Sequence, residues 1–411
     1  MQFNENKGGF SMYSTPAIVS DPQRANPAPM EYRKNIFRNY SYPLHPTKKQ
    51  AALLRERMRQ RDDFFNKCAK VATSGALLGR PISEIENQIN TLPCHYAALS
   101  NPAFCRALKG VRTNMIKLLH KLQTGTINWI SPRSNTHLRK SLTFLSAKTS
   151  EQYTDLPTIG AIHTTFYRPL PANYRLCYVT VVEDCYGASF HITFTILYPC
   201  FFPAAQPVLF KNAIGLDYKQ DGGYITSTGE SGNFVHFREK AEPKLRRHYQ
   251  AASRHHRGSR RWKKHMQRAA KCEKHIVNQR KHMHNILANR LARQYDAIFV
   301  ENLDLASMKR DYPQLAKKIN ENAYSSFLRK LEHTCCVRGK SFIKVDHWYP
   351  SSQTCACCGK HIGKLPLEKR TVICPFCGTQ IDRDHNAAIN ILKEGFDYYQ
   401  KRTLQQSNYA S

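Results

Sequence analysis

Four cysteines in the last third of the sequence are spaced as zinc ligands usually are. Cys355 and Cys358 form one C-x-x-C pair, and Cys374 and Cys377 form a second. Each such turn brings two thiolates to one side of a knuckle, and two knuckles complete the tetrahedron of sulfur ligands that suits Zn2+. Two matched pairs argue against a single redox pair. Since four protein ligands leave no open position, we predict one structural zinc ion.

Three acids stand where acids are uncommon. Asp217 and Glu301 each end an apolar, strand-like run, and Asp384 precedes a helical run of small and apolar residues. Taken singly, Asp217 and Glu301 fit ordinary strand-end acids, and Asp384 fits a helix N-cap. Together, carboxylates at neighbouring strand ends and on an adjacent helix can bind two hard cations about 4 Å apart, which serve phosphodiester cleavage. We therefore predict that these acids bind two Mg2+ or Mn2+ ions.

The net charge of the chain indicates a polyanionic partner. Sixty-two lysines and arginines against thirty acids give +32. Such a surplus favours nucleic acid, because each neutralised phosphate releases condensed counterions, although a ribosomal or membrane-surface protein could share it. The surplus is densest in a predicted helical stretch at about residues 243–295, for which a solvated helix pair is the alternative interpretation. The candidate nucleic-acid contacts there are Arg246, Arg247, Arg260, Arg261, Lys263 and Lys264.

Neither a membrane span nor a disulfide framework is expected. The sequence has no window of about eighteen apolar residues, and its start lacks the basic-then-apolar pattern of a secretory signal. Ten of the fourteen cysteines lie outside the two pairs, mostly scattered, which favours a reducing cytosol and one metal site. Cys357 could compete with Cys358 as a ligand, but Gly359 directly after Cys358 favours the standard register.

The pattern of elements changes twice along the chain. A strand-like run at 35–42 precedes helical periodicity over 46–125, in which Ser83 and Glu86 predict a capping box. From about residue 128, β-branched and aromatic segments predict a mostly antiparallel β domain. A third region mixes strands with helices. The strands expected in that region are 208–216, 224–226, 297–300 and 342–346.

Several segments resemble those of TnpB, a family of transposon-encoded, RNA-guided nucleases related to compact type V CRISPR effectors. The three RuvC motifs and zinc ribbon of that family are similar to IGLDYKQDGGYITSTGE, AIFVENLDLASM and SSQTCACCG…CPFCGTQIDRDHNAAINIL. Its first recognition helix and its wedge domain are similar to PTKKQAALLRERMRQRDDFFNKCAK and RPLPANYRLCYVTVVEDCYG. The likeness covers residues from about 34 to 395.

The resemblance implies a multidomain α+β fold with a helical recognition domain, a β-barrel wedge domain and an RNase H-like (RuvC) α/β nuclease domain that contains an inserted zinc ribbon. It also implies that Asp217, Glu301 and Asp384 are the catalytic carboxylates. The expected parts are a flexible leader (1–33), a first wedge strand (34–45), the recognition domain (46–127), the wedge domain (128–207), the nuclease domain (208–350), the zinc ribbon (351–381), the third RuvC motif with its helix (382–397) and a polar tail (398–411).

The activity implied by the resemblance is Mg2+-dependent cleavage of double-stranded target DNA, after pairing with a transposon-encoded guide RNA and recognition of a short flanking DNA motif. We expect a prokaryotic, cytoplasmic, nucleoid-associated protein that acts as a monomer with one RNA.

Two features depart from the family. The leader is longer than is typical, and VNQRKHMHNIL has His282 and Asn285 where the family often has Asp and His. The alternatives are an RNA-guided regulator that does not cleave DNA, a general RNA-binding protein with the zinc ribbon as its only site, and a compact type V CRISPR effector. The intact acidic triad favours cleavage.

Overall fold

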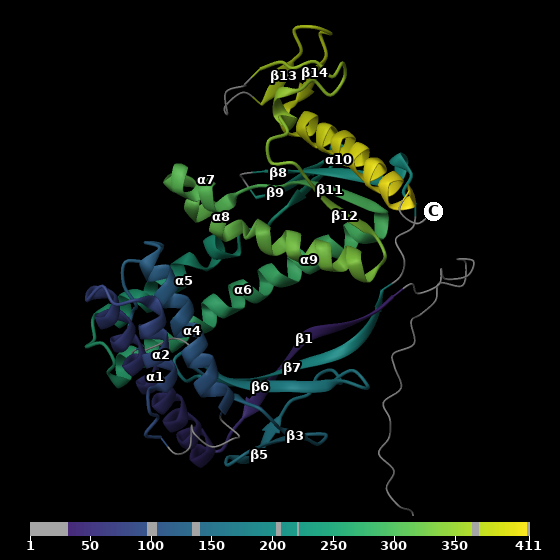
Figure 1. Cartoon of the computed structure of the whole chain (residues 1–411). Coiled ribbons are helices and arrows are strands. Elements are labelled where there is room, and N and C mark those ends of the chain that lie inside the picture. Colours follow the sequence, from purple (N-terminus) through teal and green to yellow (C-terminus); the bar gives the residue numbers. More distant parts are fainter. Residues whose placement is uncertain are drawn as a thin grey trace, which may run out of the picture. The chain divides into compact units, whose positions relative to one another are not determined.

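The computed structural model describes residues 32–96, 105–133, 140–202, 207–219, 222–363 and 370–408. They are of mixed α/β type and form two compact units (Figure 1). The first unit contains Lys34–Cys200 and Arg247–Lys271, and the second contains Phe201–Arg246 and Cys272–Ser411. The leader predicted at 1–33 lies outside the described residues except for its last two. Within the described ranges, no helix is long and apolar enough to cross a membrane.

The first helix of the first unit begins at a capping box, and the second begins after a proline. Thr47 and Gln50 form a capping box, in which the Thr47 hydroxyl accepts a hydrogen bond from the Gln50 backbone amide at 3.3 Å. The capping box predicted at Ser83 is wrong, because the N-cap of the second helix is Pro81, two residues earlier, which makes no side-chain hydrogen bond. Ser83 therefore lies inside the first turn. These helices are α1 (Lys48–Leu77), α2 (Ile82–Thr91) and α4 (Cys105–Gln123).

A seven-stranded sheet shares one hydrophobic core with these helices. Its strand order is β2-β6-β7-β1-β5-β4-β3, which leaves β2 and β3 as the two edges over the described residues. The mostly antiparallel pairing predicted from the sequence is present, and the described strands form an open sheet where the family resemblance implies a β-barrel. The strands are β1 (Tyr32–His45), β2 (Lys140–Phe144), β3 (Lys148–Thr149), β4 (Tyr153–Leu156), β5 (Gly160–Thr164), β6 (Arg175–Asp184) and β7 (Ser189–Phe202).

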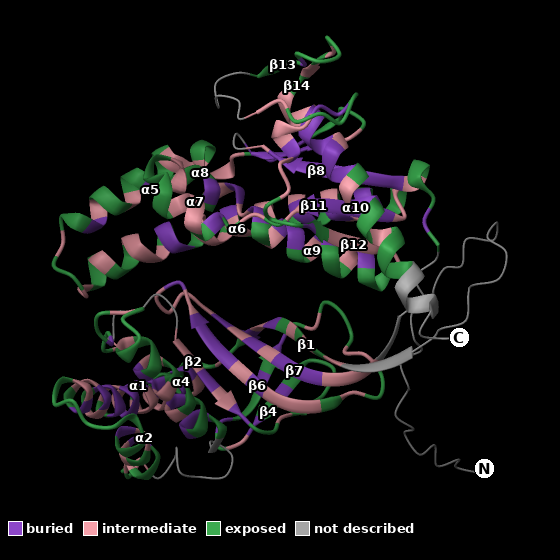
Figure 2. Ribbon diagram, turned by 45° about the horizontal axis from the view of Figure 1, so that its top comes forward, coloured by how far each residue is buried: buried purple, intermediate pink, exposed green. Residues whose placement is uncertain are grey.

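The second unit is built on a five-stranded sheet of order β10-β9-β8-β11-β12. β11 pairs in parallel with both β8 and β12, and both β8 and β11 are almost wholly buried (Figure 2). The strands are β8 (Ala213–Tyr218), β9 (Gly223–Thr226), β10 (Ser231–Asn233), β11 (Ala297–Glu301) and β12 (Ser341–Val345). Its helices are α7 (Leu305–Asp311), α8 (Ala316–Asn322), α9 (Tyr324–Val337) and α10 (Arg383–Asn408), together with the start of α5 (Phe237–Ser253) and the later part of α6 (Arg260–Gln294).

Alternate residues of β8 and β11 face opposite helical layers. Ile214 and Ile298 belong to a cluster that includes residues of α6 and α9, whereas Ala213 and Phe299 belong to a cluster with α10. Because strand side chains alternate, the odd-numbered positions of both strands face α10. That helix continues to Asn408, through part of the predicted polar tail, since no glycine or proline interrupts its last two turns.

Helices α5 and α6 form the basic stretch and are separated by a short turn, in which Gly258 has a φ of 89°. Residues 247–271 at this end belong to the first unit. Trp262 packs edge-on against Tyr186, with ring centroids 5.5 Å apart, and the Gln267 side chain donates a hydrogen bond to the Tyr186 carbonyl at 3.0 Å. The helix pair thus carries basic residues of both units.

Gly215 in β8 is required by the close approach of α10. A Cβ atom at this position would lie 2.2 Å from the Ala388 carbonyl oxygen and 2.6 Å from the Leu392 nitrogen, both of them backbone atoms that cannot rotate away. We expect Gly215→Ala to destabilise the protein by about 3 kcal/mol and to displace α10. The matched control is Gly110→Ala in α4, where an added Cβ meets nothing within 4 Å and should stabilise the helix by about 0.5–1 kcal/mol. Urea unfolding measures both; equal effects would contradict the packing argument.

His284 of α6 is a buried, uncharged histidine within the segment that departs from the family. Its ring packs 4.8 Å from Phe234 and 5.7 Å from Phe327, and burial lowers its pKa to about 4, with Arg280 and Lys330 adding to the effect. Since the unfolded chain protonates this group near pH 6.5, stability is lost as pH falls from about 6.5 to 4, by up to about 3 kcal/mol.

We expect His284→Leu to remove this loss. The unfolding free energy of the wild type minus that of the variant should decrease as the pH falls from 6.5 to 4. Only the wild type has the His284 ring, which takes up a proton on unfolding in this pH range. His282→Leu is the matched control, since His282 is exposed on the same helix. A pH-independent difference for His284→Leu would refute the assignment of a neutral buried ring.

Candidate active site and zinc site

Asp217 and Glu301 lie at the ends of two neighbouring parallel strands, Asp217 as the second-last residue of β8 and Glu301 as the last residue of β11. The β8–β11 register pairs Leu216 with Val300, so the next residues along the strands are Asp217 and Glu301. Both occupy odd-numbered positions, on the face that carries Phe299 toward α10. Asp217 is 9% exposed and Glu301 is half-buried. The fold therefore brings these two predicted acids together at the carboxyl edge of the sheet, facing the same helix.

Asp384 lies in the first turn of that helix, α10. An N-cap is the alternative interpretation of Asp384, but the residue that caps α10 is Asp382. The Asp382 carboxylate accepts a hydrogen bond from the His385 backbone amide at 3.0 Å. The Asp384 carboxylate instead accepts a hydrogen bond from the Arg370 guanidinium at 3.2 Å. Because Asp382 caps the helix, the side chain of Asp384 is available for another role.

Asp217 is electrostatically coupled to the other two carboxylates. Burial, then the nearby Glu301 and Asp384 carboxylates, raise the pKa of Asp217 well above its usual value. Burial also raises the pKa of Glu301, opposed by His347, and that of Asp384, opposed by Arg370. Like charges gathered in a buried place are costly unless a cation or a proton neutralises them.

The donor set fits a hard divalent cation. Carboxylate oxygens are the ligands that Mg2+ takes from proteins, and a cation among these three would relieve the repulsion that raises the Asp217 pKa. The acids are not drawn tightly together: among the described residues, the groups of at least three His, Cys, Asp or Glu ligand atoms all within 4.8 Å are the four cysteines and His236–Glu239–Glu321. A looser set suits two ions, since each carboxylate then needs to reach only one of them or to bridge the pair.

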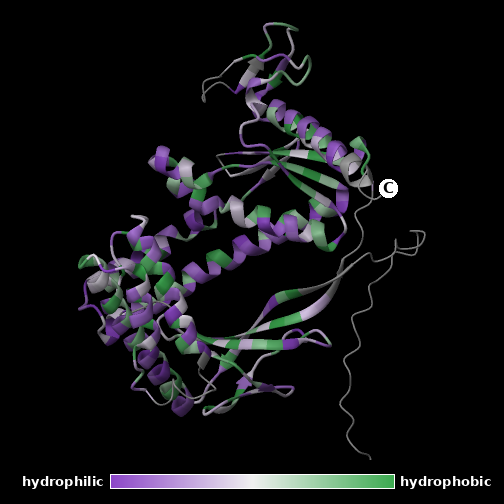
Figure 3. Ribbon diagram, in the orientation of Figure 1, coloured by the Kyte–Doolittle hydropathy of each residue, from purple (hydrophilic) through white to green (hydrophobic). Residues whose placement is uncertain are grey.

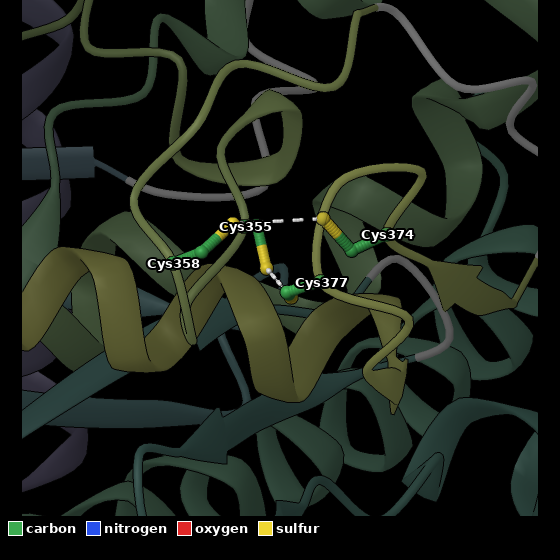
Figure 4. Close-up of side chains that lie close together, drawn as sticks. All are labelled: Cys355, Cys358, Cys374 and Cys377. Atoms are coloured by element: carbon green, nitrogen blue, oxygen red, sulfur yellow. Dashed lines mark hydrogen bonds between the residues drawn. The ribbon is translucent and has the colours of Figure 1, made fainter.

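The four cysteines form a compact cluster (Figure 4). The sulfur atoms of Cys355 and Cys377 are 3.7 Å apart, and those of Cys358 and Cys374 are 3.6 Å apart. Zn–S bonds of about 2.3 Å place tetrahedral sulfurs about 3.8 Å apart, so the cluster has the size of a zinc site. Cys357 is exposed and is not part of the cluster, which resolves the ligand register in favour of Cys358.

The two knuckles have the same backbone geometry. The Gly359 amide donates to the Cys355 carbonyl at 2.9 Å, and the Gly378 amide donates to the Cys374 carbonyl at 3.0 Å. Gly359 and Gly378 have φ values of 73° and 70°, in the left-handed region that favours glycine. The second knuckle joins the two strands of the hairpin of β13 (Thr371–Ile373) and β14 (Gln380–Asp382), which leads directly into α10.

Hydrogen bonds attach the first knuckle to α10. The wholly buried Asn386 accepts from the Ala356 amide at 2.8 Å and donates to the Thr354 carbonyl at 2.7 Å. Asn390, 2% exposed, donates to the carbonyls of Ser351 and Thr354 at 2.8 and 2.7 Å. The cluster is thus attached to the same helix that carries Asp384, with Asn386 only two residues further along.

The matches to known proteins point to one family. Residues 324–391 match the family described as "Cas12f1-like, TNB domain", and residues 229–311 match the one described as "Probable transposase". The chain is 27% identical over 374 residues to the "Putative RNA-guided DNA endonuclease" of Streptomyces pristinaespiralis, which covers 88% of this chain and 90% of that protein. It is 30% identical over 137 residues to a "TnpB-like protein" of Acanthamoeba polyphaga mimivirus, covering 32% of this chain and 26% of that protein.

These matches support the TnpB family for this chain. Among solved structures, "Cryo-EM structure of the Cas12f1-sgRNA-target DNA complex" aligns with this chain at a TM-score of 0.46 and 13% identity, over 87% of this chain and 99% of the other.

The six basic residues predicted to contact nucleic acid are all exposed. They lie on α5 and α6, and α6 is largely hydrophilic along its length (Figure 3). The acid Glu273 within the stretch is bound on one side by Arg238, at 2.7 Å.

Several polar residues around the acids and the zinc knuckle are not predicted from the sequence. Arg370 contacts Asp384, His347 acts on Glu301, and Asn386 and Asn390 hold the zinc knuckle. A usable signal exists for the two asparagines, because amides spaced four apart in an apolar helix need buried partners. Arg370 and His347 carry no such signal. The cluster of His236, Glu239 and Glu321 has Arg238 3.9 Å from Glu321, which places a fixed cation beside it.

Proposed function

We propose that this protein is an RNA-guided DNA endonuclease that cleaves phosphodiester bonds by two-metal RuvC chemistry. The guide is a transposon-encoded RNA, the substrate is double-stranded target DNA next to a short flanking motif, and bases are read by pairing. In this proposal the first unit corresponds to the recognition and wedge domains, and the second unit to the nuclease domain with its zinc ribbon.

The observation that carries the proposal is the strand register that places the buried Asp217 beside Glu301 at the carboxyl edge of the sheet, where Asp217 is also electrostatically coupled to Asp384 of α10. Acids gathered in this way in a chain of charge +32 are difficult to explain unless cations bind there. The names of the relatives support the same activity: the Streptomyces protein, similar over nearly the full length of both chains, is named an RNA-guided DNA endonuclease.

Each residue has a defined task in this proposal. Asp217, which is electrostatically coupled to both of the other acids, would hold both cations. Glu301 and Asp384 would each complete the ligand set of one cation. Bound Mg2+ would supply an activated water and neutralise charge on the leaving oxygen. Arg370 would release Asp384 to the cation and become available to the substrate phosphate. The four cysteines would hold a structural zinc ion.

The proposal is tested by purifying the protein with the RNA that accompanies it, sequencing that RNA, and incubating the complex with a plasmid that carries the matching target. We expect Mg2+-dependent cutting of the matched plasmid and none of a plasmid with a scrambled target. Target binding without cutting, in Mg2+ or in Mn2+, would instead support an RNA-guided regulator. Binding of RNA with no target-dependent step would support a general RNA-binding protein.

A further inference from the structure

Trp348 is a large apolar side chain in an unusual place. It is 85% exposed, although tryptophan is normally among the most buried side chains by area. It follows the parallel strand β12, whose register pairs Val345 with Glu301. Trp348 therefore stands three residues beyond the partner of Glu301, at the same carboxyl edge of the sheet as the acids. In parallel sheets this edge is where ligands bind.

The turn that carries Trp348 is fixed by hydrogen bonds rather than loose. The Trp348 amide donates to the Asp346 carboxylate at 2.9 Å, and the Tyr349 amide donates to the Asp346 carbonyl at 3.2 Å. The adjacent His347 donates from Nδ1 to the Asn302 carbonyl at 2.9 Å. Asn302 directly follows Glu301, so these contacts attach the tryptophan turn to the acid-bearing strand.

The His347 ring also supports the indole. The two rings meet in a T-shaped contact with centroids 5.0 Å apart, and the exposure of Trp348 leaves most of its surface open. A fixed and open aromatic ring is a platform for stacking. Nucleobases stack on such rings regardless of sequence, provided that the base is not already stacked within a duplex.

The edge thus offers a contact for each part of a nucleotide. The acids would bind cations, and the Arg370 guanidinium, 3.2 Å from the Asp384 carboxylate, lies where it could meet a phosphate beside them. We propose that Trp348 stacks on a base of the single DNA strand that is being cleaved, and thereby holds the adjacent phosphodiester at the acids. This inference rests on the proposed nuclease function.

The first test compares cleavage rates at saturating RNA–protein complex. We expect Trp348→Ala to slow cutting about 10- to 100-fold, and Trp348→Phe to retain most of the rate, because phenylalanine also stacks. Trp129→Ala is the matched control, since Trp129 is another exposed tryptophan, 63% exposed, in the first unit. An abasic site at the nucleotide next to the cut should slow the wild type to a similar extent and slow Trp348→Ala no further.

The second test does not depend on activity. The chain has three tryptophans, so Trp129→Phe and Trp262→Phe leave Trp348 as the sole indole. Added to Asp217→Ala, these changes give a non-cleaving protein whose tryptophan fluorescence should be quenched on loading matched target DNA. An oligonucleotide abasic at the same nucleotide should not quench it.

The outcomes separate this inference from the nuclease proposal. A wild type that fails to cut under all conditions overturns the nuclease proposal itself. A wild type that cuts, with Trp348→Ala cutting equally fast and no quenching, overturns the stacking role alone. If Trp348→Ala mainly lowers the unfolding temperature or RNA retention, the indole is covered by the chain or by RNA, and the DNA-base assignment is refuted.

Discussion

We expect Asp217→Ala to abolish DNA cleavage, by about 1,000-fold or more, while RNA retention and target binding stay within about twofold of the wild type. Burial and both of the other acids raise the pKa of Asp217, which marks it as the ligand that the two cations would share. Residues that act together in catalysis lose most of their effect when any one of them is removed, so the loss of Asp217 should abolish cutting. Cleavage is measured on matched plasmid, and binding by gel shift.

Two controls define what this loss means. Glu332→Ala removes an exposed acid of α9 and should leave cutting unchanged. Asp217→Asn keeps the shape but removes the charge; without divalent cations it should unfold at a higher temperature than the wild type near neutral pH, because a buried, repelled carboxylate is gone. Mg2+ should then stabilise the wild type but not this variant. Residual cutting by Asp217→Ala above background would refute the assignment.

The second large effect is expected for Cys374→Ser. Losing one of four thiolates should reduce zinc content from one ion per chain to almost none and lower the thermal stability of the second unit. DNA cutting should fall by at least about tenfold although no acid is changed, because Asn386 and Asn390 bind a knuckle that the zinc ion keeps folded.

Cys357→Ser is the matched control for this variant. Cys357 lies in the same knuckle, is exposed and is outside the sulfur cluster, so its replacement should leave zinc content and cutting unchanged. Zinc is measured by elemental analysis of the purified protein. Full zinc content in Cys374→Ser, or loss of zinc in Cys357→Ser, would overturn the ligand assignment.

Local patterns in the sequence predict the elements of the candidate site but not all of their partners. The apolar runs that end in Asp217 and Glu301 identify both strands, and the spacing of the cysteines identifies their cluster. That β8 and β11 are parallel neighbours depends on pairing between residues some eighty positions apart, which local periodicity does not encode. The resemblance to TnpB implies that the two strands are neighbours, because it assigns Asp217 and Glu301 to one catalytic site.

Other features are decided by competition among nearby residues. Asp382 and Asp384 are both acids at the start of α10, and only the geometry shows that Asp382 is the cap. Similarly, Ser83 with Glu86 has the composition of a capping box, but Pro81 begins α2 earlier and leaves Ser83 within the helix. In both cases the residue types are right for a cap, and the position of the helix start decides between them.

Because hydrogen bonds attach the cysteine cluster to α10, we expect EDTA to inhibit the proposed nuclease in two stages. A chelator would remove ions from two sites of unlike chemistry, the oxygen ligands that include Asp384 of α10 and the sulfur ligands of the cluster attached to that helix. Brief exposure should strip only the exchangeable ion, and added Mg2+ should restore cutting at once. Prolonged exposure should also empty the cysteines, after which Mg2+ alone no longer rescues the enzyme and recovery requires zinc and refolding of the knuckle.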